Sequence, residues 1–133
     1  MQARTLLLVD DEPHILLSLR YLFRTLPGVN ILTAENGAQA VALAEEHRPC
    51  LILMDVMMPV LDGFEACRRI KAIPGYGERV AVWLVTARGE RIDRHRGTVV
   101  GADDYITKPY DPDEFLRRVQ EHLDRLATAE VSG

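Results

Sequence analysis

Five polar side chains directly follow four short apolar runs of the sequence. Asp10 and Asp11 come after residues 6–9, Asp55 after residues 51–54, Thr86 after residues 82–85, and Lys108 after residues 105–107. If these runs are parallel strands of one sheet, their carboxyl ends lie at the same edge, where open α/β sheets bind ligands. Three carboxylates, a hydroxyl and an ammonium group would then converge on one pocket.

This set of groups suits magnesium and phosphoryl-transfer chemistry. Clustered carboxylates repel each other unless protons or a cation compensate their charge, and Mg²⁺ prefers oxygen ligands. Phosphoryl transfer needs mostly alignment and charge neutralisation, and an aspartate can itself become the acceptor. Asp55, alone at its strand end, is the candidate nucleophile, whereas Asp10 and Asp11 are a pair suited to holding a metal. Lys108 would supply a positive charge and Thr86 a hydroxyl donor to phosphoryl oxygens.

Three of these residues also have a purely structural interpretation. Asp11, before Glu12 and a proline, is a possible helix N-cap. Thr86 is a possible cap for the following helix, and a lysine before a proline is often a solvated loop residue. Four such residues at corresponding strand ends favour the functional interpretation.

Alternation of short apolar runs with segments of helical period predicts five βα units around a parallel sheet. The first helix should bury the stripe Ile15, Leu16, Leu19, Leu22, Phe23 and Leu26 and stop at Pro27-Gly28. A strand is expected over residues 29–33. A helix starting at Asn36 should face inward through Ala40, Val41 and Ala44 and end before Pro49.

Two later helices begin with capping signals. Asp62 can cap a helix and Glu65 can complete a capping box, and Asp111 with Glu114 repeats the pattern. The inner faces are Phe64, Cys67 and Ile70 in the first of these helices, and Phe115, Leu116, Val119, Leu123 and Leu126 in the second. A helix within residues 89–99 contains two glycines and few apolar residues, so its low propensity suits either a moving element or a frayed surface helix.

The size, charge and composition of the chain are those of a single domain without a membrane span. A chain of 133 residues with formal charge −4 is one domain with no general reason to bind nucleic acid. Cys50 and Cys67 are expected as core residues. No apolar run has the length of a signal peptide core or a membrane span, so we expect a cytoplasmic protein with no membrane partner. Residues 127–133 are interpreted as a frayed helix end or the start of a linker.

The sequence resembles the receiver domains of two-component response regulators over roughly residues 5–126. The matching segments are LVDDE at residues 8–12, LMDVMMPVLDG at 53–63, VTA at 85–87 and GADDYITKPY at 101–110. The resemblance implies an α/β fold, a flavodoxin-like (βα)5 sheet in strand order 2-1-3-4-5, with the receiver domain at residues 1–126. A receiver that acts alone and one that is part of a longer regulator look the same over these residues.

The same resemblance implies roles for individual residues. Asp55 would accept a phosphoryl group from a partner histidine kinase or phosphotransfer protein, in a signalling domain that is not an enzyme. Mg²⁺ would be held by Asp11, Asp55 and the backbone carbonyl of Met57, with Asp10 assisting through water. Lys108 and Thr86 would bind phosphoryl oxygens, and the peptide bond after Lys108 is expected to be cis.

The implied switch moves Thr86 toward the phosphoryl group and Tyr105 inward, which reshapes the surface of the weak helix and the last strand. Alternatively, Tyr105 is an edge-strand aromatic with its hydroxyl in water. Met57 and Arg88 flank the path of an attacking water, so we expect them to set the phosphoryl lifetime.

The output of the switch is less constrained by the sequence. Arg94, Asp104, Glu114 and Arg118 match charged positions through which one subfamily of transcription factors forms a homodimer, using helix 4, strand 5 and helix 5. Val99 and Val100 stand where that subfamily carries acidic residues, so part of the ion-pair network would be missing. The arginine-rich run Arg88, Arg91, Arg94, His95 and Arg96 is either a surface for an acidic partner or a solvated face.

Two other functions suit these residues less well. A magnesium phosphohydrolase with Asp55 as transient nucleophile would need a second carboxylate where Met57 stands, and a cap over the site. A flavin-binding module would need a glycine-rich phosphate loop after the first strand, where the acidic residues 10–12 would repel phosphate.

Overall fold

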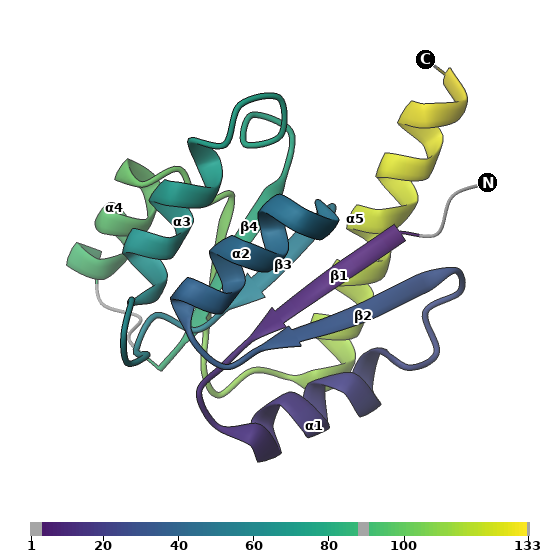
Figure 1. Cartoon of the computed structure of the whole chain (residues 1–133). Helices are drawn as coiled ribbons and strands as arrows, with labels where there is room; N and C mark the ends of the chain where they lie inside the picture. Colours follow the sequence, from purple (N-terminus) through teal and green to yellow (C-terminus); the bar gives the residue numbers. More distant parts are fainter. Residues whose placement is uncertain (1–3, 88–90, 133) are drawn as a thin grey trace.

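The computed structural model describes residues 4–87 and 91–132. Its elements are β1 (Arg4–Val9), α1 (Pro13–Phe23), β2 (Val29–Ala34), α2 (Gly37–His47), β3 (Leu51–Met54), α3 (Gly63–Lys71), β4 (Ala81–Thr86), α4 (Arg91–Val99), β5 (Asp104–Thr107) and α5 (Pro112–Ser132). The strands are all parallel, in the order β2-β1-β3-β4-β5, with helices packed on the sheet (Figure 1). This confirms the fold and the strand order expected from the resemblance.

Alternating side chains of the central strands build two separate cores, one on each face of the sheet. Leu6 and Leu8 of β1 face a cluster that includes Phe23 of α1 and Phe115 of α5. The intervening Leu7 faces a cluster formed mainly by α2 and α3. All side chains of β3 and β4 are buried, as expected for strands covered by helices on both faces.

The first helix ends earlier than its apolar stripe predicts. α1 stops at Phe23, and Leu26 is buried in the turn that follows, where its N–H donates to the Phe23 carbonyl at 3.1 Å. Because Leu26 precedes a proline, helical backbone is disfavoured at this position. The stripe therefore identified the core residues correctly and the helix end incorrectly.

Only one of the two contacts of the predicted capping box forms at the start of α3. The Asp62 carboxylate accepts from the Glu65 N–H at 2.9 Å, but the Glu65 carboxylate binds Arg68 one turn later. A charge-assisted bond to arginine is stronger than one to a neutral N–H, which explains the difference. α5 continues as a helix through Ser132, and none of the helices in the described residues is long and apolar enough to cross a membrane.

Candidate functional site

Parallel pairing brings the acidic residues of β1 and β3 together. Val9 and Met54 are register partners, and the Asp55 N–H donates to the Val9 carbonyl at 2.9 Å. Asp10, Asp11 and Asp55 each offer one carboxylate oxygen, and these oxygens all lie within 4.8 Å of one another. Asp10 is buried, Asp55 is half-buried and Asp11 is exposed. Three sequence-predicted site residues thus form one cluster that opens to solvent.

Local backbone hydrogen bonds orient two of these carboxylates. Asp10 Oδ1 accepts from the Glu12 N–H at 3.0 Å, and Asp55 Oδ1 accepts from the Met57 N–H at 3.3 Å. The N-cap residue of α1 is Glu12, without a side-chain cap, so the interpretation of Asp11 as an N-cap is wrong. Asp11 is therefore free of the role that competed with cation binding.

Lys108 reaches the acidic cluster from the end of β5. Its Nζ atom lies 3.2 Å from Asp10 Oδ2 and 3.7 Å from Asp55 Oδ2. Its backbone N–H donates to the Thr86 carbonyl at 2.8 Å, and the peptide bond to Pro109 is cis. The interpretation of Lys108 as a solvated loop residue is therefore wrong.

Opposing effects set the charges of this cluster. Burial raises the pKa of Asp55, the Lys108 ammonium acts to lower it, Asp10 raises it again, and the net shift is upward. Burial alone would lower the pKa of Lys108, but the carboxylates of Asp55 and Asp10 outweigh burial and raise it. Lys108 therefore stays protonated and positively charged. The Asp55 carboxylate, in contrast, is costly to keep charged without further positive charge nearby.

Such a donor set can hold a divalent cation. A buried and a half-buried carboxylate next to an exposed one provide oxygen ligands with open coordination positions, which hard cations prefer. One ammonium group compensates only part of the negative charge of three carboxylates. A cation in this cluster would remove the repulsion that Asp10 adds to Asp55.

Thr86 and Tyr105 lie on the two strands next to this cluster. Thr86 is the last residue of β4 and is buried, and Ala87 after it is a bend rather than a helical residue, so Thr86 is not the N-cap of a helix. Tyr105 is buried, with its ring near Gly97 and the Arg94 guanidinium 5.2 Å from the ring centroid. In this structure the Tyr105 ring therefore lies against α4 rather than in solvent.

The loop after β3 contains a strained residue that the sequence patterns did not reveal. Val60 has φ +71° and is exposed, and the Leu61 N–H donates across it to the Pro59 carbonyl at 2.7 Å. Positive φ is a genuine outlier for a β-branched residue. Met57, in the same loop, is also exposed. Arg88, predicted to act together with Met57, lies outside the described residues.

An apolar groove adjoins the site and was also missed. Leu17 and Tyr21 of α1 are exposed on one side, Tyr110 and Pro112 line the other, and the groove measures about 540 Å³. Tyr110 is close enough to Lys108 and Asp10 for their charges to act on its pKa, which burial raises. The available signal was that Leu17 and Tyr21, four residues apart on one helix face, lie outside the buried stripe of α1.

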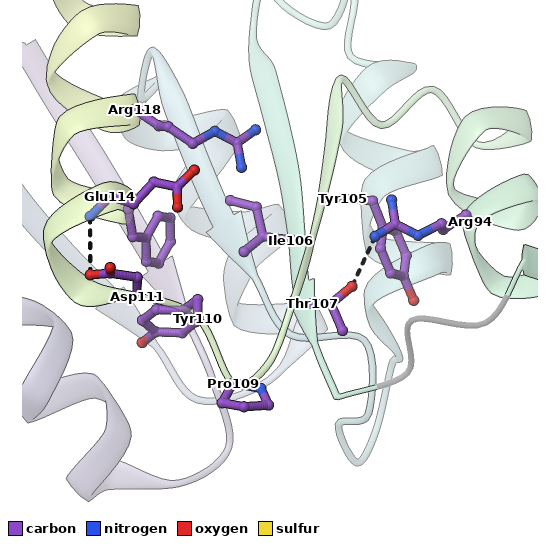
Figure 2. Close-up of a pocket in the computed structure, with 10 residues that line it drawn as sticks. Arg94, Tyr105, Ile106, Thr107, Pro109, Tyr110, Asp111, Glu114 and Arg118 are labelled. Atoms are coloured by element: carbon purple, nitrogen blue, oxygen red, sulfur yellow. Dashed lines mark hydrogen bonds between the residues drawn. The ribbon is translucent and has the colours of Figure 1, made fainter.

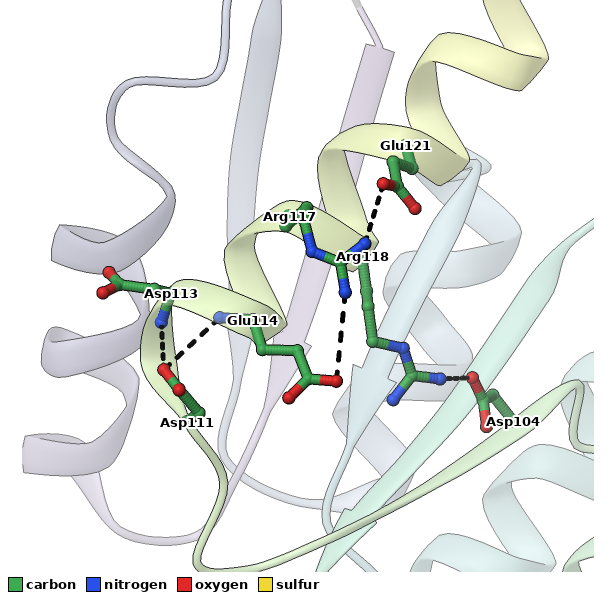
Figure 3. Close-up of polar contacts among 7 residues, drawn as sticks. All are labelled: Asp104, Asp111, Asp113, Glu114, Arg117, Arg118 and Glu121. Atoms are coloured by element: carbon green, nitrogen blue, oxygen red, sulfur yellow. Dashed lines mark hydrogen bonds and ion pairs between the residues drawn. The ribbon is translucent and has the colours of Figure 1, made fainter.

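A second groove, of about 290 Å³, crosses the face formed by α4, β5 and α5 (Figure 2). On one side Arg94 Nη2 donates to Thr107 Oγ1 at 2.9 Å. On the other side Arg118 pairs with Asp104 of the same chain (Figure 3). Two of the charged residues predicted for a dimer interface are thus already paired with each other within this chain.

Comparisons with known proteins all point to one family. The family model of the response regulator receiver domain matches residues 6–120. The alkaline phosphatase synthesis transcriptional regulatory protein PhoP of Bacillus subtilis is 37% identical over 130 residues, which are 98% of this chain and 52% of that protein. The phosphate regulon transcriptional regulatory protein PhoB of Rhizobium meliloti is 38% identical over 117 residues, 88% of this chain and 51% of that protein. The chain spans about half the length of these relatives.

Solved structures give the same result. The receiver domain of the sensor histidine kinase PA1611 from Pseudomonas aeruginosa has a TM-score of 0.79 and 36% identity, over 90% of this chain and 96% of that one. That structure has a magnesium ion coordinated in its active site cleft. The chemotaxis protein CheY4 of Vibrio cholerae has a TM-score of 0.81 and 27% identity, over 90% of this chain and 98% of that one.

Proposed function

Because this chain belongs to the response regulator receiver domains, we propose that it accepts a phosphoryl group on Asp55 and acts as a phosphorylation-controlled switch. The observation that carries the proposal is the convergence of three carboxylates and the Lys108 ammonium on one edge of the sheet. We place the domain at residues 1–126, with residues 127–133 as a C-terminal tail or the start of a linker.

The proposed reaction is a transfer from a phosphohistidine of a partner histidine kinase or phosphotransfer protein. An Asp55 carboxylate oxygen attacks phosphorus, and a P–O bond forms while the P–N bond breaks. The imidazole nitrogen keeps the electron pair of that bond and takes a proton from solvent. Lys108, 3.7 Å from Asp55 Oδ2, neutralises a phosphoryl oxygen, and Thr86 donates its hydroxyl to another.

Mg²⁺ is the proposed cofactor, held by Asp11, Asp55 and the Met57 backbone carbonyl, with Asp10 acting through water. Bound there, it would compensate the charge that the phosphoryl group brings to the carboxylate cluster. Asp10 also keeps Lys108 in place through the 3.2 Å contact of its Oδ2 atom.

The proposed conformational response follows from the position of Thr86 next to β5. When Thr86 moves to the phosphoryl group, the space it leaves stabilises the inward position of Tyr105. Arg94 contacts both Tyr105 and Thr107, so the change reaches α4 directly. The new charge would shift the populations of two states that are close in free energy and differ in how α4 packs on β5.

The apolar groove beside Lys108 is the proposed docking site for a helix of the kinase. Its lining by Leu17, Tyr21 and Pro112 suits the apolar face of an amphipathic helix. Leu17→Ala should slow phosphotransfer from the kinase but leave phosphorylation by a small-molecule donor unchanged.

A homodimer through α4, β5 and α5 is a further part of the proposal. Arg118 and Asp104 would have to exchange their contact within the chain for contacts with a second copy. With Val99 and Val100 in place of acidic residues, the dimer should be weak, because exposed ion pairs contribute ~1 kcal/mol or less each.

The decisive experiment is incubation with acetyl phosphate and Mg²⁺, followed by intact-mass measurement. The proposal expects one added phosphoryl group, absent in Asp55→Ala and in EDTA. Continuous hydrolysis of phosphate esters without an accumulating adduct would instead support a phosphohydrolase, a function that the exposed Met57 at the second-carboxylate position does not favour.

The phosphoryl lifetime is measured in the same assay. Met57 is exposed beside Asp55, so Met57→Asn should change how the attacking water is held and alter the dephosphorylation rate, and Arg88→Ala should act similarly. An unchanged rate in both variants would contradict this role.

A further inference from the structure

Helices α3 and α4 carry more basic than acidic residues, opposite to the balance of the whole chain. The two helices contain six arginine and lysine residues and two acidic ones, whereas the chain has a net charge of −4. Figure 1 shows the helices side by side, and the Arg96 guanidinium lies 4.2 Å from the centroid of the Phe64 ring of α3. These two helices therefore carry a local excess of positive charge in a protein that is acidic as a whole.

Two arginines of α4, Arg94 and Arg96, have different surroundings. Arg94 is turned toward β5, where its guanidinium donates to Thr107. Arg96, two residues later and on another side of the helix, is turned toward α3. Within the described residues, Arg94 and Arg96 therefore face different neighbours, and Arg96 is the one that lies against α3.

The guanidinium groups near α3 are held in place before any partner binds. Arg68 is held by a bidentate contact with Glu65, at 3.0 and 2.9 Å from its Nε atom, and Arg69 lies 3.7 Å from the same carboxylate. Arg96 lies over the Phe64 ring and makes no hydrogen bond or ion pair within the described residues. Preorganised arginine forks lose little entropy when they bind a carboxylate.

An exposed apolar residue accompanies this charge. Val99 is 71% exposed and lies three residues after Arg96, which makes the two side chains neighbours on the helix surface. A polyphosphate backbone gains nothing from such a residue, whereas a peptide with apolar side chains does. A long nucleic acid would also meet the negative charge of the rest of the chain.

We infer that Arg68, Arg69, Arg96 and Val99, hereafter the α3–α4 surface, bind a short acidic segment of a partner protein that also carries an apolar side chain. Carboxylates of the segment bind Arg96 and the outer edges of Arg68 and Arg69, and its apolar side chain covers Val99. The surface uses no proposed phosphotransfer residue, so it can be tested on the unphosphorylated protein.

The probe is a short fluorescein-labelled peptide of glutamate residues around a central leucine, and its binding is followed by fluorescence anisotropy. We expect saturable binding that weakens with salt, and none for the same peptide with glutamine in place of glutamate. The double variant Arg69→Glu, Arg96→Glu should bind about tenfold more weakly. Arg20→Glu with Arg125→Glu, an equal charge change on α1 and α5, should have little effect.

Two more measurements keep the test decisive. Arg96→Lys retains the charge and the fold but loses the planar fork, and it should weaken binding by a smaller factor. Circular dichroism of each variant checks that the fold is intact. Equal losses in both double variants, or competition by nonspecific duplex DNA at the same concentration of negative charge, would overturn the inference.

Discussion

Replacing Lys108 by methionine tests how the acidic cluster is compensated. Lys108 Nζ lies 3.2 Å from Asp10 Oδ2 and 3.7 Å from Asp55 Oδ2, and at an effective dielectric constant of ~20 each contact is worth about 5 kcal/mol of Coulomb attraction. Desolvation of the ammonium and its partial exposure to solvent offset most of this attraction. Removing one partner of a buried ion pair lowers the free energy of unfolding by ~3–5 kcal/mol, and removing one partner of an exposed pair lowers it by less than ~1 kcal/mol. Because this pair is partly buried, we expect Lys108→Met to lower the free energy of unfolding by about 2 kcal/mol.

The diagnostic part is the effect of Mg²⁺ on that loss. Without Lys108, no ammonium competes for the carboxylate oxygens, so a divalent cation should bind more tightly and stabilise the variant more than the parent. Urea unfolding, followed by fluorescence of the single tryptophan, Trp83, measures both proteins in EDTA and in Mg²⁺. The deficit of Lys108→Met should be largest in EDTA and should shrink in Mg²⁺.

Lys71→Met is the matched control. Lys71 Nζ is also partly buried and lies 2.7 Å from Asp103 Oδ2, but it contacts no member of the acidic cluster. The loss of unfolding free energy caused by Lys71→Met should be the same with and without Mg²⁺. If Lys108→Met behaves like this control, Lys108 does not compensate the cluster that binds the cation, and the charge argument fails.

Three further predictions concern stability. Val60→Gly should raise the free energy of unfolding by about 1 kcal/mol, because relief of the positive φ exceeds the backbone entropy that glycine adds to the unfolded chain, and the exposed valine gives up no packing. An unchanged or lower urea midpoint would contradict this balance. Tyr76→Phe should cost about 1–2 kcal/mol, since its buried hydroxyl donates to the Pro49 carbonyl at 2.5 Å, and a midpoint equal to the parent's would contradict this. Burial, assisted by Arg125, lowers the pKa of His122 from 6.5, and its Nε2 has no partner within the described residues. At pH values between 6.5 and that lowered pKa, the unfolded chain binds a proton that the folded chain does not, so the free energy of unfolding should fall as the pH drops through this range. In His122→Phe, the urea midpoint should vary less with pH over the same range.

The strand ends were predictable from the sequence because strands buried on both faces appear as short continuous apolar runs. Asp55 directly follows such a run, and a parallel sheet leaves only one edge where it can meet Asp10. The run before Lys108 predicts the same edge for this residue, but no local pattern encodes which strand β5 pairs with. The resemblance to a family, not the periodicity, supplied that pairing.

Local exceptions were beyond sequence reasoning because they depend on competition between nearby partners. Glu65 had two possible partners, the N-cap N–H and Arg68, and only the structure shows that the guanidinium is bound. The positive φ of Val60 contradicts the preference of valine, so no propensity argument finds it. Likewise, the division of the arginine run depends on what each side of α4 faces, which becomes known only once α3 and β5 are placed.

The paired ends of β4 and β5 explain how an event at the acidic cluster could reach α4 through few contacts. Thr86 and Thr107 are register partners, and Lys108 donates its N–H to the Thr86 carbonyl. Thr107 in turn accepts from Arg94, the arginine of α4 that faces β5. In the proposed switch, movement of Thr86 therefore needs no long pathway, because one residue separates the phosphoryl-binding groups from the α4 contact. The α3–α4 surface lies on another side of the same helix, so any shift of α4 that breaks the Arg94 contact would also move Arg96 relative to Phe64.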